Sequence, residues 1–298
     1  MSKNIAFRRQ HITNSNNNEL TYKFKRPMTF TQRSSIAIAH MSLYFSWFNI
    51  NKQRYNNNFF QYKFWDINGD LQTFDVNIVD GYYSVNTLNE YLQSVLINNG
   101  HYLINTNSGK YKYFLELTTN LEYYGVEIRL TSCSVNMLSD TGMKIYTDTY
   151  NASTTWTPPD VFETPEFIIP SNNKFGEIIG FSPRTVTHDL TVQPANDSVL
   201  STLNDLVPNL LPSSSYLVTC DLIQNDMSSD RDDILHAFTI NFGVGFGQII
   251  NASTDLIYSQ TKVGIFEKCR IKIYDQDLQE LKIIDPSILI LMSFLNVD

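Results

Sequence analysis

Clustered acidic side chains mark two places in this sequence where a hard cation could bind. Asp66-Ile67-Asn68-Gly69-Asp70 offers oxygens at positions 1, 3 and 5, as at the start of a calcium loop. The pattern then fails, because Leu71 stands in place of the glycine and Asn77 in place of the bidentate glutamate. Since Asn-Gly is a strong hairpin signal, we interpret this segment as a turn. The second cluster, interpreted as a solvated loop, comprises Asp226, Asp230, Asp232 and Asp233.

Histidines would be the other ligands for a metal ion. No two of them stand at the two- or four-residue spacing that places paired zinc ligands on one element. The five are His11, His40, His101, His188 and His236. Two of them, His40 and His236, fall within apolar strand patterns. This context favours a core or interface position for both over a catalytic role.

Nucleophilic and cofactor chemistry is not indicated either. The cysteines, Cys133, Cys220 and Cys269, are odd in number and form no CxxC pair. Cys220 and Cys269 lie in apolar strand patterns, so we expect buried free thiols and assembly in a reducing compartment. There is no GxSxG elbow or P-loop, and residues 243–247 are glycine-rich but precede no helix pattern, as expected of a turn. The sequence therefore predicts a protein that is not an enzyme, with no catalytic, cofactor-binding or metal residues.

The charge balance bears on nucleic-acid and membrane partners. The chain has 298 residues, 22 Lys+Arg against 30 Asp+Glu, and a formal net charge of −8. Its densest basic segments, Arg8-Arg9 and residues 23–26, are short, so we expect no sequence-specific nucleic-acid binding. The polar N-terminus predicts no signal peptide, and no apolar run is long enough for a membrane span.

The long run at residues 35–50 is the strongest strand signal. With a period of two, one face is wholly apolar, and we predict that it fills a sandwich core. That face comprises Ala37, Ala39, Met41, Leu43, Phe45 and Trp47. The other face, which includes His40 and Tyr44, is expected to be covered by a helix or offered to a neighbouring molecule.

Turn and helix signals divide the rest of the first half. Residues 58–66 and 71–79 are predicted to form a hairpin, and residues 84–98 a helix that ends at Gly100. Thr87 with Glu90 fits a capping box for that helix. A short helix is expected over 172–179, and residues 199–206 carry a weak helical signal.

Strands dominate the remaining predictions. They are expected at 19–26, 112–118, 125–132, 216–223, 234–242, 255–260, 269–275 and 288–295. Many short strands with few helices indicate an all-β sandwich with one or two short helices, and long connections between early and late strands favour a Greek-key or jelly-roll topology over a meander. We expect residues 1–18 to be a flexible arm and 19–298 one domain, with loop insertions near 139–165 and 182–215.

Four segments, in order, resemble the penton (minor capsid) proteins of virophages and Maverick/Polinton-like elements, most of all the mavirus-type virophages. The first is residues 43–50, which end in Trp47-Phe48-Asn49-Ile50. The others are 81–85 with the following helix, 173–181, and a C-terminal block of 216–223, 235–238 and 270–275. Residues 139–165 match no part of that pattern.

The resemblance implies a structural viral capsid protein. It implies a jelly roll that forms homopentamers at the five-fold vertices of an icosahedral virion, next to a major capsid protein with a double jelly roll. Assembly would take place in the host cytoplasm. An attachment or glycan-binding jelly roll is the alternative, for which Tyr82-Tyr83 and Tyr123-Tyr124 are candidate surface contacts. A jelly-roll enzyme that uses the acidic loop, and a major capsid role, are weaker alternatives.

Overall fold

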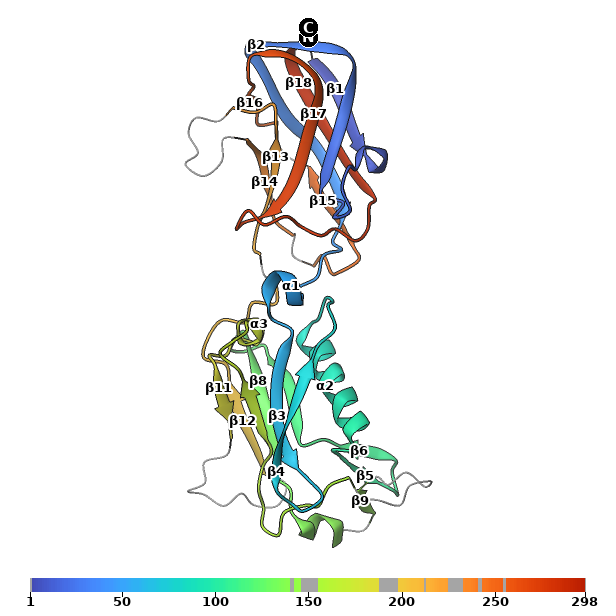
Figure 1. The fold of residues 1–298 in the computed structure, drawn as a ribbon, viewed down its shortest axis with the longest axis vertical. Coiled ribbons are helices and arrows are strands. Elements are labelled where there is room, and N and C mark those ends of the chain that lie inside the picture. Colours follow the sequence, from blue (N-terminus) through green and yellow to red (C-terminus); the bar gives the residue numbers. More distant parts are fainter. Residues whose placement is uncertain are drawn as a thin grey trace. The chain divides into compact units, whose positions relative to one another are not determined.

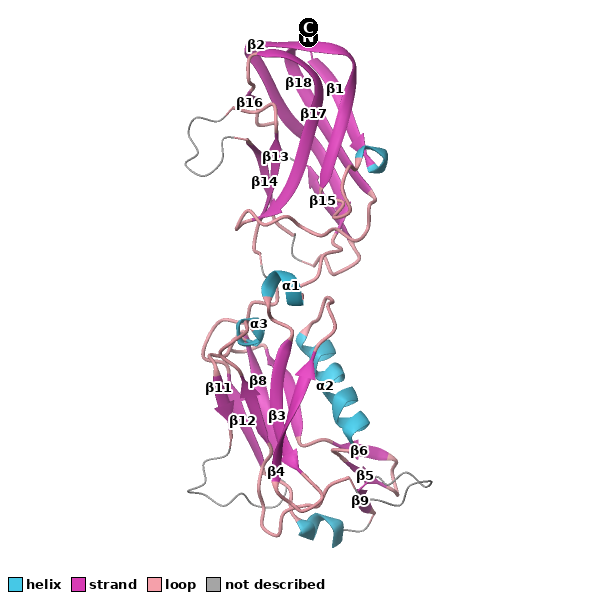
Figure 2. Cartoon of the chain, in the orientation of Figure 1, coloured by secondary structure: helices cyan, strands magenta, loops and turns pink. Residues whose placement is uncertain are grey.

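Antiparallel strands are the main regular secondary structure in both units into which the chain divides (Figures 1 and 2). The computed structural model describes residues 2–139, 142–145, 155–187, 198–211, 213–224, 233–240, 243–253 and 256–297. Unit 1 combines Met1–Trp47 with Ser213–Asp298, and unit 2 is Phe48–Pro212.

Unit 1 is built from the two ends of the chain. Its strands are β1 (Ser2–Arg8), β2 (Glu19–Tyr44), β13 (Tyr216–Cys220), β14 (Ile234–Phe238), β15 (Ile249–Ser253), β16 (Ser259–Gln260), β17 (Gly264–Asp275) and β18 (Ile288–Val297). A single turn of 3-10 helix, Arg9–His11, follows β1. The hydrogen-bonded order of the sheet is β1-β18-β2-β17-β13-β14, and β15 and β16 also pair with β2.

The 26-residue strand β2 belongs to two layers at once. Its first part, residues 19–30, pairs with β17, and its later part, up to Leu43, pairs with β18. One layer is therefore β1-β18-β2-β15/β16, and the other is β2-β17-β13-β14. Two four-strand layers joined in this order are a jelly roll, so the predicted all-β jelly-roll class is confirmed.

The core of unit 1 lies between these layers. The first layer contributes Ile290, Met292 and Phe294 from alternate positions of β18, and the second contributes Ile271 and Ile273 from β17. The layers also meet through aromatic contacts. The Phe30 and Phe294 rings are 6.2 Å apart, and Trp47 Nε1 donates a hydrogen bond of 2.9 Å to the Tyr216 hydroxyl.

A β-bulge changes which face of the 35–50 run is buried. Ile38 pairs with Met292 and His40 with Leu291, so Ala39 is the extra residue. After the bulge the odd-numbered side chains from Met41 to Trp47 are buried, as predicted. Before it, the even-numbered Ile36 and Ile38 share a face with the inward residues of β18. Ala37 is therefore completely buried, but on the face opposite to the predicted one, and Ala39 is half-buried at the bulge.

The N-terminal segment is not the flexible arm expected from its polar composition. Residues Ser2–Arg8 form β1, which pairs antiparallel with β18 from Ser2↔Leu295 to Arg8↔Leu289. Phe7 is completely buried. A polar sequence does not exclude an edge strand, because alternate side chains of such a strand face water.

Unit 2 is continuous in sequence and contains shorter strands. They are β3 (Phe59–Trp65), β4 (Leu71–Asn77), β5 (Leu103–Asn105), β6 (Lys110–Lys112), β7 (Leu115–Asn120), β8 (Gly125–Thr131), β9 (Met143–Ile145), β10 (Glu166–Ile169), β11 (Arg184–Val186) and β12 (Val199–Leu203). Three sheets result, with the orders β11-β10-β3-β4, β12-β8-β7 and β6-β5-β9. The helices are α1 (Lys52–Tyr55), α2 (Val85–Asn99), α3 (Phe175–Ile179) and a 3-10 turn, Val135–Ser139.

Helix α2 shows which local signals were right. Gly100 ends it in the left-handed conformation, as predicted, at φ +73°. The capping box, however, is Ser84 with Thr87, not Thr87 with Glu90. The apolar stripe of α2 enters the core of unit 2 and comprises Val85, Leu88, Leu92 and Leu96.

The division of the chain differs from the single domain expected over 19–298. The expected insertions near 139–165 and 182–215 fall largely within unit 2, which interrupts the jelly roll between β2 and β13. The weak helical signal at 199–206 is wrong, because Val199–Leu203 is strand β12, paired with β8. Strands of unit 2 have the same period as those of unit 1, so periodicity alone does not assign them to a separate unit.

Candidate functional site

The acidic segment at Asp66 is a hairpin turn between β3 and β4, as interpreted from the sequence. One Asp66 carboxylate oxygen accepts hydrogen bonds from the backbone N–H groups of Asn68 and Asp70, at 2.8 and 3.1 Å. That carboxylate therefore closes the turn. Of the second acidic group, Asp226, Asp230 and Asp232 lie outside the described residues, and the backbone oxygen of Asp233 accepts from Cys220 N at 2.9 Å.

The described histidines occupy separate places. His40 lies in β2 and His236 in β14, both half-buried, and His11 is in the 3-10 turn after β1. His101 is buried in unit 2, where its Nδ1 lies 2.9 Å from the Tyr62 hydroxyl and its ring stacks on Phe64. Burial lowers the pKa of His101 to about 4. His188 lies outside the described residues.

The three cysteines are free and buried, as expected. Cys133 lies in unit 2, and burial raises the pKa of its thiol to about 12. Cys220 and Cys269 are neighbours in unit 1, although 49 residues separate them in the sequence. The sequence analysis did not pair them, because a β-ladder that joins distant segments leaves no spacing signal.

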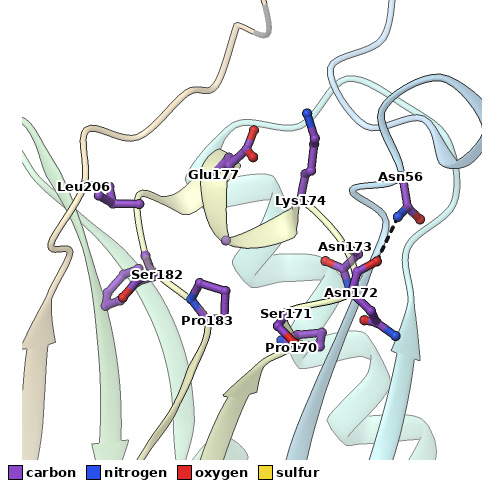
Figure 3. A pocket seen from close by; sticks show the side chains of 12 residues that line it. Asn56, Pro170, Ser171, Asn172, Asn173, Lys174, Glu177, Ser182, Pro183 and Leu206 are labelled. Atoms are coloured by element: carbon purple, nitrogen blue, oxygen red, sulfur yellow. Dashed lines mark hydrogen bonds between the residues drawn. The ribbon is translucent and has the colours of Figure 1, made fainter.

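A polar pocket in unit 2 is a candidate for a small-ligand site (Figure 3). It lies beside α3 and has a volume of about 450 Å³. Its walls are mainly short polar side chains and prolines: Asn56, Pro170, Ser171, Asn172, Asn173, Lys174, Gly176, Glu177, Phe181, Ser182, Pro183 and Leu206. The α3 helix was predictable from its local pattern, but the pocket was not, because its lining residues are far apart in the sequence.

Hydrogen bonds hold the polar wall of the pocket in place. Asn56 Nδ2 donates to the Asn172 carbonyl at 2.9 Å, and Asn173 Oδ1 accepts from Phe175 N at 2.9 Å. Asn173 Nδ2 is buried without a hydrogen-bond partner. Lys174 and Glu177 add one charge of each sign. Such a wall suits a neutral or zwitterionic polar ligand.

Exposed apolar side chains mark a different kind of candidate site. In unit 1, Val263 and Ile265 are 62% and 71% exposed and line a groove with residues 29–33 of β2. In unit 2 the turn between β7 and β8 carries Leu121, Tyr123 and Tyr124, which are 69–89% exposed. The predicted exposure of Tyr123-Tyr124 is thus confirmed, whereas Tyr82 and Tyr83 are half-buried. Scattered apolar residues are ordinary on surfaces, but clusters at turns are typical of protein contacts.

Comparisons with known proteins found a similar structure but no sequence match. No protein-family model matches the chain, and no curated protein matches it. Among solved structures, the chain is similar to the mavirus penton protein, at 11% identity and a TM-score of 0.46, over 100% of this chain and 98% of that one. Within the described parts of the chain, no helix is long and apolar enough to cross a membrane.

Proposed function

We propose that this chain is a structural capsid protein that forms homopentamers at the five-fold vertices of an icosahedral virion. The jelly roll of unit 1, with its two layers joined through β2, is the observation that carries this proposal. Jelly rolls of eight strands are frequent in capsid proteins, although they also occur in lectins and enzymes. The ordered motifs at 43–50, 173–181 and 270–275 add support from the sequence.

The surface of unit 1 supports contact between copies. A closed ring uses heterologous contacts, in which one patch meets a different patch on the next copy. The groove of Val263, Ile265 and residues 29–33 offers one such patch, because two largely exposed aliphatic side chains gain from being covered. We propose that each chain contacts other copies of itself in the pentamer and a major capsid protein with a double jelly roll. The proposal includes no sequence-specific binding of nucleic acid and no membrane span.

This proposal also assigns the protein no enzymatic activity. It gives the chain a place in the virion, at the capsid vertices, after assembly in the host cytoplasm. Binding energy in such an assembly comes from buried surface and a few anchors, so no catalytic residue or cofactor is required.

Mass measurement and particle imaging test the proposal. Native mass spectrometry of the purified chain should show five copies, and cryo-electron microscopy of particles should show density for it at the five-fold vertices. Ile265→Asp should weaken assembly at least ~10-fold, because it places a charge in an apolar contact. Ile67→Asp, at an exposed position in the turn of unit 2, is the matched control. A trimer in solution, or density only at local three-fold positions, would contradict the proposal.

The pocket of Figure 3 favours one alternative function, that of an attachment or glycan-binding protein. The amide and hydroxyl side chains of its wall are groups of the kind that bind sugar hydroxyls. A glycan array with the wild type and with Asn173→Ala separates the two functions. Hits that disappear in the variant, together with a trimeric mass, would favour the alternative over the capsid vertex.

A further inference from the structure

Two buried thiols and a carboxylate meet at the end of β13 in unit 1. In the ladder between β13 and β17, Cys220 lies opposite Ile271, so Cys269 is its diagonal neighbour on the same face of the sheet. The two sulfur atoms are 3.5 Å apart. One ligand atom each from Cys220, Asp221 and Cys269 lies within 4.8 Å of the other two.

The distance between the sulfur atoms distinguishes the possible uses of this pair. A disulfide needs about 2.05 Å between them. Two thiolates bound to one tetrahedral zinc ion, each at about 2.3 Å, lie roughly 3.8 Å apart. The observed 3.5 Å, which also fits an S–H···S hydrogen bond between the metal-free thiols, is within a few tenths of an ångström of the second arrangement, and an Asp221 oxygen within 4.8 Å of both sulfur atoms can supply a third ligand.

We propose that Cys220, Cys269 and Asp221 form a site for Zn²⁺, with a water molecule as the fourth ligand. Thiolates select soft or borderline cations such as Zn²⁺ over Mg²⁺ and Ca²⁺. Each thiol loses its proton as its Zn–S bond forms, so one ion displaces two protons, and the Asp221 carboxylate binds without a redox change. Three protein ligands and a water are a complete tetrahedral set for this ion.

The surroundings of the three ligands are suited to this role. One Asp221 oxygen accepts from the Arg270 backbone N–H at 2.8 Å, which orients the carboxylate and leaves its second oxygen, 4.0 Å from Arg270 Nε, for the ion. The Lys262 ammonium donates to the Asp221 carbonyl at 3.0 Å. Two thiolates, a carboxylate and Zn²⁺ sum to a net charge of −1, and these two cationic side chains offset it.

Both ligand cysteines lie in the core of unit 1. Their side chains are fully buried, and their sulfur atoms are in direct contact. With Zn²⁺, the last residue of β13 is tied to β17 and to the start of the following turn, so binding stabilises unit 1 by linkage.

Metal binding to the intact, reduced chain tests the site. The protein is purified with a phosphine reductant, stripped with a chelator, and titrated with Zn²⁺ and, separately, with Co²⁺. We expect one Zn²⁺ per chain, about two protons released, a higher melting temperature, and thiolate-to-Co²⁺ charge-transfer absorption. Mg²⁺ at the same concentration should have no effect.

Variants separate this site from adventitious binding. Asp221→Asn keeps an acceptor for the Arg270 N–H, so it should fold, and it should weaken Zn²⁺ binding at least ~10-fold. Cys269→Ser should abolish the Co²⁺ charge-transfer band, whereas Cys133→Ser, in unit 2, should keep it. If the folded wild type binds no Zn²⁺, or if Asp221→Asn and Cys133→Ser bind it equally well, the site does not exist and the thiols serve only the core.

Discussion

The two units of this protein use the same strand chemistry with opposite chain organisation. Unit 1 joins segments from the two ends of the chain, and its ladder pairs Ser2 with Leu295. Unit 2 is one continuous segment, and two of its sheets contain hairpins of consecutive strands, β3–β4 and β7–β8. Pairing of strands that are distant in sequence loses loop-closure entropy before its contacts stabilise the fold. We therefore expect the strand pairs of unit 1 to form late in folding.

The units also differ in what fills their cores. Between the layers of unit 1 lie aliphatic side chains from long strands together with separate aromatic rings such as Phe45 and Phe294. Unit 2 is held by a compact aromatic group around Trp65 and Trp156, whose rings are 6.0 Å apart, and by the apolar stripe of α2. We therefore expect unit 2 to remain folded when unit 1 is disrupted.

The largest effect is expected from Phe45→Asp. The Phe45 side chain is 1% exposed, and its ring lies 5.0 Å from that of Trp47 and 5.8 Å from that of Phe246. A carboxylate there would be buried without a partner, so unit 1 should fail to fold and the protein should leave the soluble fraction. Tyr44→Ala, on the other side of the same strand, is the control and should stay soluble. A soluble Phe45→Asp with unchanged melting temperature would refute the face assignment.

Deletion of residues 2–8 should come next in size. It removes strand β1, exposes the edge of β18 and takes away the buried Phe7 ring, whose loss alone costs about 3–5 kcal/mol. Amides of β18 should exchange with solvent much faster by hydrogen-exchange mass spectrometry, while those of β3 keep their protection. Lys3→Ala, which changes one exposed side chain of β1, should leave both unchanged. Unaltered β18 exchange after the deletion would restore the flexible-arm interpretation.

A smaller, pH-dependent effect is expected in unit 2. The folded pKa of His101 is about 4, below the ordinary 6.5, because burial disfavours the charged ring. As the pH falls, His101 is therefore protonated in the unfolded chain before it is protonated in the folded one. The free energy of unfolding of unit 2 should fall by about 3 kcal/mol at most between pH 6.5 and pH 4. Below pH 4 this group should cause no further change. Urea unfolding at pH 7 and pH 4.5 measures the loss.

The variant His101→Phe isolates that contribution. It keeps a ring beside Phe64 and removes the titrating group, so the difference between pH 7 and pH 4.5 should shrink for unit 2. His40→Gln, in unit 1, should leave the pH dependence of unit 2 as in the wild type. An identical pH dependence for wild type and His101→Phe would show that other groups account for it.

The smallest effect is expected from Asp205→Asn. Partial burial works against the charged form, but hydrogen bonds from Ser182 and the nearby Arg184 charge outweigh it and lower the pKa of Asp205 to about 2. The lowered pKa contributes stability above pH 3.8 that is lost as the pH falls through 2. Because the side chain is 38% exposed, we expect a loss of less than ~1 kcal/mol at pH 7 by urea unfolding. A loss above 2 kcal/mol would show that this ion pair is more than a surface contact.

Local signals in the sequence were sufficient for most elements. The Asn-Gly turn between β3 and β4, the α2 stripe with its stop at Gly100, and the alternation of β8 and β17 each depend on a few neighbouring residues. The candidate sites were less predictable. The polar pocket combines Asn56, Lys174 and Leu206, and the thiol pair combines Cys220 and Cys269, and no spacing rule connects residues so far apart.

The sequence by itself determined the all-β class, because period-two patterns and turn residues are written into short windows of the chain. Only the tertiary structure decided that β1 is a strand, that Ala39 is a bulge, and that residues 48–212 form a unit of their own. Each of these depends on which distant segment supplies the hydrogen-bonding partner, and a window of sequence does not contain that partner. The β-strand character of unit 1 could therefore be predicted from its residues, whereas the pairing of its strands could be read only from the tertiary structure.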